Sequence, residues 1–154
     1  MANSPQIATL AGQIAAISIT SPATLTVWGL NQVGNFAEIA RQAPVMLPDP
    51  EGFVEGFGAV RLGMGPASSA SYQYTYTLKY TVVIAPMGNG RGLNEAVPSL
   101  VDWAAAIVGY FAGHDDQFVA QEITCLPVDK FIVISDGAGG EYMGFNLAIE
   151  IEDY

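Results

Sequence analysis

The chain has 154 residues, of which 51% are hydrophobic and only 13% are charged, and its net charge is −10. A chain of this length suits one domain with a sizeable core, so we expect residues 1–154 to form a single domain. Fifteen acidic residues against five basic ones argue against a protein that binds nucleic acid by neutralising phosphates.

The apolar composition raises the question of where so much apolar surface is buried. No apolar run reaches the roughly 18 residues that a membrane helix needs. The N-terminus also lacks the basic and apolar regions of a signal peptide. We therefore expect no membrane association, and an oligomer whose subunit contacts bury the excess apolar surface. A tightly packed core in a monomer is the alternative explanation.

Few residues are suited to catalysis. The single cysteine, Cys125, excludes a disulfide within the chain and lies near Ile123 and Leu126, as a buried strand thiol would. The single histidine, His114, lies in the turn sequence Gly-His-Asp-Asp after an expected helix. A Cys–His pair in space is an alternative that no sequence signature supports, so we expect neither an enzyme nor a bound cofactor.

The first part of the chain predicts a helix followed by short strands. Residues 4–19 place apolar side chains on a 3.6-residue period, which predicts a helix. Residues 24–28 and 43–47 predict strands, with a turn-rich segment at 29–37 between them. A third strand is expected at 57–64.

An acidic loop precedes the third strand. Asp49, Glu51 and Glu55 lie among the prolines and glycines of residues 48–58. Spaced carboxylates in a loop are suited to calcium, but this spacing does not match the twelve-residue calcium loop. We therefore expect a solvated acidic loop and no metal site.

Residues 70–85 carry the longest regular pattern in the sequence. Apolar and polar or β-branched residues alternate for seven pairs, a period of two that only a strand can use. At roughly 3.3 Å per residue the strand would span about 45 Å, which exceeds the usual strand of about 5–6 residues. The apolar positions are Tyr72, Tyr74, Tyr76, Leu78, Tyr80, Val82 and Ile84.

The small residues at 65–71 predict the tip of a hairpin between the third strand and this long strand. Residues 78–85 are expected in the core. Residues 70–77 either continue the core strand or form an arm offered to another molecule. Tyrosine favours the arm, because its ring buries apolar area while its hydroxyl stays in water. The arm hypothesis gives the candidate contact residues Arg61, Met64, Tyr72, Tyr74 and Tyr76.

The second part of the chain predicts a long helix and three strands. The turn at 88–92 has glycines suited to a phosphate, but it lacks the lysine of a P-loop and the dinucleotide glycine spacing, so a flexible connection is expected. Residues 94–112 carry a broad apolar stripe, from which Asp102 and Trp103 are expected to point away. Strands are expected at 117–126, 130–135 and 141–151.

The order of elements predicts an α+β protein: a mainly antiparallel β-sheet with two helices packed on one face and a long protruding β-hairpin. Its landmarks are the segment Ala43-Pro-Val-Met-Leu-Pro48, the strand end Tyr80-Thr-Val-Val-Ile84, the apolar helix, and the last strand, Gly144-Phe-Asn-Leu-Ala-Ile-Glu-Ile151. Over nearly the whole chain, this order resembles the tail-terminator (tail-completion) proteins of long-tailed bacteriophages.

The resemblance implies a hexameric ring on the last ring of the tail tube. Such a ring ends tube polymerisation and presents a docking face to the head–tail connector. The implied partners are other copies of the chain, the tail-tube protein and the connector protein. The implied location is the virion, at the tail and neck, after assembly in the host cytoplasm.

The family has no catalytic residues to carry over, so the resemblance matches regions only. Residues 57–80 match the arm that meets neighbouring rings, and the two expected helices match the outer layer. DNA would pass through the ring without specific binding, which an acidic lumen would allow. The candidate lumen residues are Asp49, Glu51 and Glu55.

Two other classes of function stay open. The first is another virion subunit of similar architecture, either in the tail tube or in the head–tail connector of the neck. The second is a small-ligand-binding module with its site at the turn 88–92 or at the acidic loop 48–55.

Overall fold

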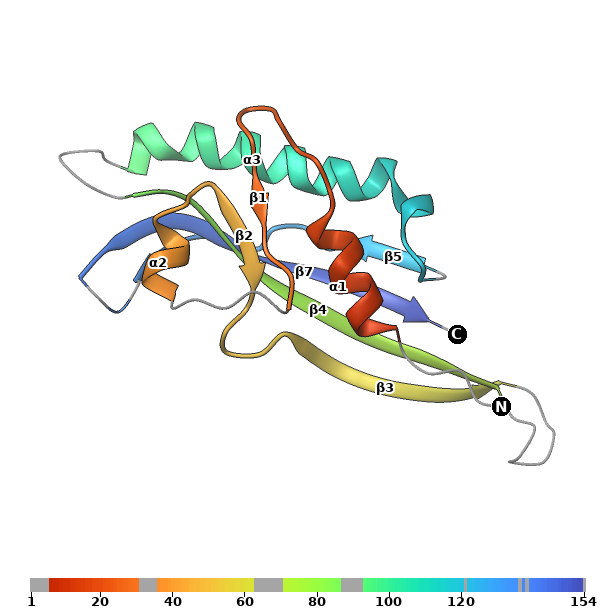
Figure 1. Cartoon of the computed structure of the whole chain (residues 1–154). Helices are drawn as coiled ribbons and strands as arrows, with labels where there is room; N and C mark the ends of the chain where they lie inside the picture. The colour runs from red at the N-terminus through yellow and green to blue at the C-terminus, as the bar shows by residue number, and fades with distance from the viewer. Residues whose placement is uncertain are drawn as a thin grey trace.

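The computed structural model describes residues 6–30, 36–62, 71–86, 93–120, 122–135, 137 and 139–153. Within these residues the chain is mixed α+β, with a mostly antiparallel sheet of seven strands and three α-helices (Figure 1). The helices are α1 (Ile7–Ala15), α2 (Phe36–Ala40) and α3 (Leu93–Gly113). The strands are β1 (Thr26–Val27), β2 (Val45–Pro48), β3 (Val54–Leu62), β4 (Ser71–Pro86), β5 (Glu122–Cys125), β6 (Phe131–Ser135) and β7 (Glu141–Asp153). The predicted α+β class and mainly antiparallel sheet are confirmed.

The sheet is organised around β4, the 16-residue strand that the alternating pattern predicts. This strand pairs antiparallel with β2, β3 and β7. Its ladder with β7 runs from Tyr74 opposite Asp153 to Pro86 opposite Tyr142. The sheet order is β1-β2-β4-β7-β5, with β3 also paired to β4 and β6 also paired to β7. Figure 1 shows β4 in green and β7 in blue lying side by side through the middle of the molecule.

The main core lies between one face of the sheet and the helices α1 and α3. The alternating apolar residues of β4 join side chains of both helices in a single buried cluster. Full burial of a large apolar side chain contributes about 1.5–3 kcal/mol, so each fully buried residue of this cluster stabilises the packing of the helices on the sheet. The helix residues in the cluster are Leu10, Ile14, Leu100, Trp103, Ile107 and Phe111.

Trp103 corrects one prediction for the long helix. Its side chain is only 4% exposed and lies in the main core, although the sequence analysis placed it off the apolar stripe. The buried positions of α3 follow steps of three and four residues from Leu100 through Trp103 and Ile107 to Phe111. Val101, an apolar residue within the predicted helix 94–112, is instead 47% exposed.

A third helix lies on the opposite face of the sheet. Ile39 and Ala40 of α2 form a separate buried cluster with side chains of β2, β4 and β7. The sequence predicts only a turn-rich segment at 29–37, so this helix corrects that prediction. Five residues are too few to show a helical period, and such a short helix depends on its tertiary contacts. The cluster covers the sheet only around Val83 and Tyr142.

Some predicted boundaries shift. Helix α1 ends at Ala15, because the β-branched residues that follow are poor helix formers. Its last turn is closed by backbone hydrogen bonds that span three residues, from the N–H of Ala16 to the carbonyl of Gln13 and from the N–H of Ile17 to the carbonyl of Ile14. Strand β3 begins three residues earlier than expected. Strand β5 is shorter than the predicted 117–126, because Gln117 ends a 3₁₀ turn, η2 (Asp115–Gln117), and bends follow at 118–120.

Candidate interaction surfaces

The hairpin of β3 and β4 has one free edge. β3 pairs with β4 only, among the strands that the structure describes, so its outer backbone groups face away from the sheet. Among the described residues, the ladder between β4 and β7 begins with Tyr74 opposite Asp153, and Ser71, Tyr72 and Gln73 are paired with β3. The expected tip at 65–71 and the candidate Met64 fall on residues that, apart from Ser71, lie outside those described.

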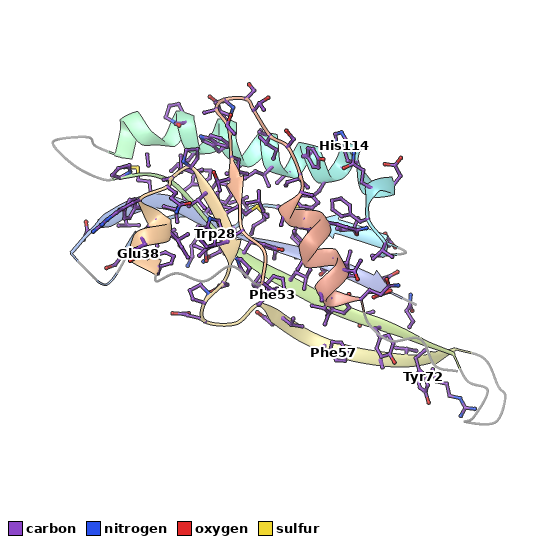
Figure 2. All side chains as sticks on the ribbon, viewed as in Figure 1. Trp28, Glu38, Phe53, Phe57, Tyr72 and His114 are labelled. Carbon is purple, nitrogen blue, oxygen red and sulfur yellow. The ribbon has the colours of Figure 1, made fainter. Side chains whose placement is uncertain are left out.

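A row of aromatic rings runs along one face of this hairpin. Phe57 stacks on Tyr74 and on Tyr76, with ring centroids 5.8 Å apart in each pair. Tyr72 continues the row, with its ring centroid 6.5 Å from that of Tyr74. Figure 2 shows Phe53, Phe57 and Tyr72 following one another along the hairpin. The row continues the core face of β4 outward, from Tyr76 in the main core, through Tyr74 packed against that core, to the half-buried Tyr72.

A β-bulge places Phe57 in this row. Glu55 lies opposite Thr77, and Gly58 lies opposite Thr75. Between these two pairs, β3 has two residues, Gly56 and Phe57, whereas β4 has only Tyr76. Gly56 has a φ of 65°, a left-handed conformation that suits glycine at the first position of such a bulge. Phe57 is not among the predicted contact residues, because strict alternation along β3 does not reveal the bulge.

The predicted contact residues differ in how much surface they offer. Arg61 is exposed, and Tyr72 and Tyr74 are half-buried. Tyr76 is 2% exposed, and its hydroxyl donates a hydrogen bond to Oδ2 of the buried Asp153 at 3.2 Å. Burial, the charge of Asp153 and this hydrogen bond together raise the pKa of Tyr76. Its ring therefore belongs to the core and offers little surface to a partner.

Exposed apolar side chains mark β3 as the most apolar edge of the sheet. Phe57 is 51% exposed on the aromatic face, and Val60 is 55% exposed on the opposite face, where it lies across from Gln73. Val54, at the start of the strand, is 38% exposed. A free strand edge with exposed apolar residues is a surface that proteins usually cover with a partner.

On the face of the sheet opposite α1 and α3, the part away from the α2 cluster is acidic. Glu150 and Glu152 of β7 alternate with buried isoleucines, and Glu122 of β5 lies directly opposite Glu152. Like charges placed opposite each other are unfavourable. The pKa of Glu152 is raised, first by a hydrogen bond with the Glu122 side chain, then by desolvation and by the charges of Glu122 and Glu150. Gln73 also donates to Glu152 at 3.4 Å.

The predicted lumen residues lie on or beside this acidic face. Glu55 is exposed and its carboxylate is 3.4 Å from the ammonium of Lys79. Asp49 accepts a hydrogen bond from the backbone N–H of Glu51 at 2.9 Å, which fixes the acidic loop. Asp49 and Glu51 line one wall of a groove of about 360 Å³, whose floor includes Thr81 and other residues of the sheet. The sequence analysis did not select Glu122, Glu150 and Glu152, although Glu150 and Glu152 stand out by their alternation.

Cys125 and His114, the two residues considered for catalysis, both pack against other side chains of the fold. Burial raises the pKa of the Cys125 thiol to about 12, which keeps it protonated and poorly nucleophilic. The ring of His114 stacks on Tyr110, with centroids 4.1 Å apart, and its Nδ1 is 2.9 Å from the Tyr110 carbonyl oxygen. No group of three potential metal ligands occurs among the described residues. The described part of the chain also contains no helix with the length and hydropathy of a membrane span.

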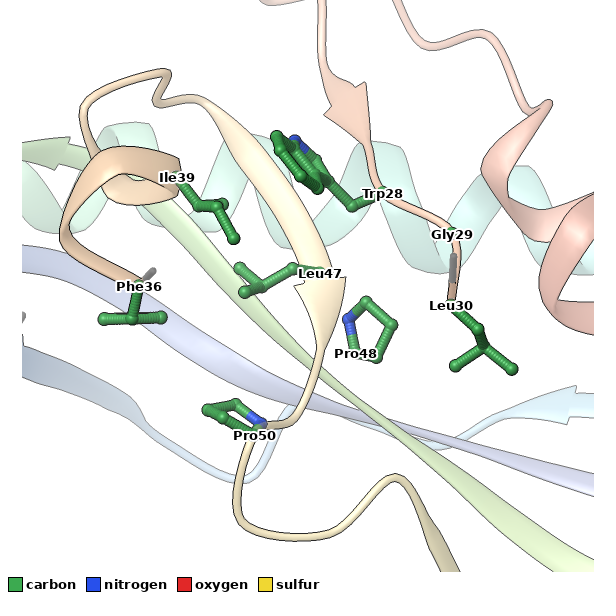
Figure 3. A pocket seen from close by; sticks show the side chains of 8 residues that line it. All are labelled: Trp28, Gly29, Leu30, Phe36, Ile39, Leu47, Pro48 and Pro50. Atoms are coloured by element: carbon green, nitrogen blue, oxygen red, sulfur yellow. The ribbon is translucent and has the colours of Figure 1, made fainter. Parts of the chain in front are cut away.

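A small apolar pocket lies beside α2 (Figure 3). Its volume is about 200 Å³, below the roughly 300–1,000 Å³ of typical ligand sites. The glycine turn 88–92, the other predicted ligand site, lies outside the described residues. The pocket is lined by Trp28, Gly29, Leu30, Phe36, Ile39, Leu47, Pro48 and Pro50.

No protein-family model matches the chain, and no curated protein matches it in sequence. Its function is therefore inferred from its own surfaces.

Proposed function

We propose that this chain is a structural subunit of a bacteriophage tail. Copies assemble into a six-fold ring at the head-proximal end of the tail tube. The ring ends tube polymerisation and joins the tail to the head connector. The observation that carries this proposal is one sheet with two unlike surfaces: a free apolar edge at β3, and an acidic face without α1 or α3.

The free edge suits a subunit that is surrounded by others. Exposed Phe57 and Val60 lie on the two sides of β3, so a contact at this edge would bury apolar surface from both faces of the hairpin. In a ring, each subunit contacts two neighbours through different surfaces. Such contacts account for an apolar composition without a membrane span. In this proposal α1 and α3 form the outer layer of the ring, and the protruding hairpin is the arm.

The acidic face suits the wall of a channel for DNA. Glu122, Glu150 and Glu152 lie together on β5 and β7, with Glu55 on β3. Repeated around a ring, these carboxylates would repel phosphates and oppose adhesion of DNA during passage. Asp49 and Glu51 would lie at the margin of the same channel.

The proposal names the partners and the location. The partners are other copies of the chain, the tail-tube protein and the head–tail connector protein, while DNA passes without specific binding. The ring belongs to the tail and neck of the virion and assembles in the host cytoplasm. The chain acts without catalysis or cofactor.

The test is the mass of the purified protein, alone and mixed with tail tubes of the same virus, by light scattering and negative-stain microscopy. Six-fold rings, or density that caps one end of each tube, would support the proposal. A monomer that ignores the tubes would contradict it.

A tail-tube subunit is the second candidate, because a free apolar edge and an acidic face would serve a tube as well as a terminal ring. The same microscopy separates the two functions. A tube subunit polymerises alone into long tubes, whereas a terminator stops at one ring.

A further inference from the structure

Near the hairpin, the two edge strands of the sheet are β3 and β5, and one row of paired residues crosses the sheet from one to the other. In this part of the sheet the order is β3-β4-β7-β5. Gly58 lies opposite Thr75, Thr75 opposite Glu152, and Glu152 opposite Glu122. On their outer sides, β3 and β5 pair with no strand that the structure describes.

The chemistry of the β3 edge is apolar and cationic. Arg61 lies three residues beyond Gly58 and directly opposite Tyr72, on the aromatic face that carries Phe57. Its side chain is exposed and forms no ion pair within the described parts of the chain. A cation is notable here, because the whole chain has only five basic residues.

The chemistry of the β5 side is apolar and anionic. Strands β3 and β5 are antiparallel to each other. The residues that follow Gly58 in β3, including Arg61, therefore lie toward the same end of the sheet as the residues that precede Glu122. In this segment Asp116 is exposed, and Val119 is 39% exposed. Asp116 has no ion-pair partner among the residues described.

This segment is held firmly on the helices. Phe118 stacks on Phe111 of α3, with ring centroids 5.4 Å apart. The backbone N–H of Val119 donates to Oε1 of Gln13 of α1 at 2.9 Å. The segment therefore presents Asp116 and Val119 on a fixed support, which limits the entropy lost on binding.

We propose that the β3 edge of one copy docks against the β5 side of a second copy, with Arg61 facing Asp116 and Phe57 facing Val119. The two surfaces are complementary in charge and both are partly apolar, yet they lie on opposite edges and cannot meet within one chain. The contact is heterologous, so repetition of it closes a ring or extends a filament. The inference rests on the proposed assembly and names the surfaces that join its neighbouring subunits.

Cysteine cross-linking tests this contact in the assembled protein, alone or at tube ends. Two variants are made in a Cys125→Ala background, one with Arg61→Cys and one with Asp116→Cys. A disulfide-linked dimer is expected when the two variants are mixed and absent when either is oxidised alone. The matched control is Val133→Cys, an exposed position on β6, which should not cross-link to Arg61→Cys.

Charge exchange gives a second measurement that needs no change at Cys125. Arg61→Glu or Asp116→Arg should each weaken self-association about tenfold, and the double exchange should restore it. Both side chains are exposed, so the folded state of a single chain should be unaffected.

The outcomes separate this contact from the proposed ring. Cross-linking of Arg61→Cys with itself, or six-fold rings without the mixed cross-link, would overturn the contact and leave the ring standing. The mixed cross-link in an assembly without six-fold symmetry would support the contact and overturn the ring. Failure of the double exchange to restore association would also overturn the contact.

Discussion

Strand β4 carries tyrosines along one face of the sheet, and they differ in burial between its inner part (Tyr76 and Tyr80) and its outer part (Tyr72 and Tyr74). Tyr80 and Tyr76 are 0% and 2% exposed in the main core, whereas Tyr74 and Tyr72 are half-buried. The strand, its alternation and the residue type do not change between the two parts. What changes is the packing around each ring: Tyr80 and Tyr76 are members of the main core, Tyr74 packs against that core, and Tyr72 extends the row with its ring centroid 6.5 Å from that of Tyr74. The role of each tyrosine is therefore set by what packs on it.

The largest effect should come from truncation of the inner tyrosine. Tyr80→Ala should lower the free energy of unfolding by about 3–5 kcal/mol, because it removes a fully buried ring that packs edge-on against Phe53. Tyr72→Ala should lower it by less than about 1 kcal/mol. Urea denaturation of both variants measures the difference. Equal losses would show that the two parts of β4 have the same role.

Removal of the buried carboxylate should have the next largest effect. Asp153 is 1% exposed and accepts hydrogen bonds from the Tyr76 hydroxyl and from the backbone N–H of Gln6 at 2.8 Å. Asp153→Ala leaves both donors without this acceptor, which should cost about 2–4 kcal/mol by the same denaturation assay. Glu150→Ala, an exposed carboxylate on the same strand, is the control and should change stability little.

The two inner tyrosines should respond differently to loss of the hydroxyl. Tyr76→Phe removes a hydrogen bond to a charged acceptor and should cost about 1.5–3 kcal/mol. Tyr80→Phe should be neutral or stabilising, because its buried hydroxyl has no hydrogen-bond partner in the described structure. A larger loss for Tyr80→Phe in thermal unfolding would contradict this assignment.

For the outer part, the expected effect is on assembly. Phe57→Ser should weaken self-association about tenfold, which corresponds to about 1.4 kcal/mol, because it removes an exposed ring at the free edge. Val133→Ser, which alters a similarly exposed apolar residue on β6, should leave assembly unchanged. Sedimentation velocity over a range of concentrations measures both. An equal loss in the two variants would remove the special role of the hairpin.

The smallest effect concerns pH and the acidic face. Because the pKa of Glu152 is raised in the folded chain, the native state keeps this proton to higher pH than the unfolded state does. The resulting stabilisation is fully present below the unfolded pKa and is lost as pH rises through the folded pKa. Glu122→Gln should remove this loss of stability with rising pH, whereas Glu141→Gln should leave it unchanged. Unfolding between about pH 4 and pH 7 provides the test.

The sequence predicts the part of the fold that follows from strong periodicity. Seven alternating pairs identify β4 because no other structure satisfies that period, and a broad apolar stripe identifies α3. The short helix α2 leaves no such signal, since its stability depends partly on contacts with Val83 and Tyr142, which are distant in the sequence. Trp103 was misplaced because the stripe of α3 is wide enough for two alignments.

The candidate surfaces follow the same rule. Tyr72 and Arg61 could be selected from the alternation and the position of the hairpin. Phe57 could not, because its orientation depends on the bulge at Gly56. The acidic face was only partly visible, since the sequence does not reveal that β5 pairs with β7 and brings Glu122 opposite Glu152.

The most direct test of the proposed function is growth of tail tubes in the presence of this chain. Purified tube subunits of the same virus are assembled with increasing amounts of the protein, and tube lengths and ends are recorded by negative-stain microscopy. The account predicts tubes that stop growing and carry a ring at one end. Tubes of unchanged length with bare ends, or the chain incorporated along the tube wall, would contradict it.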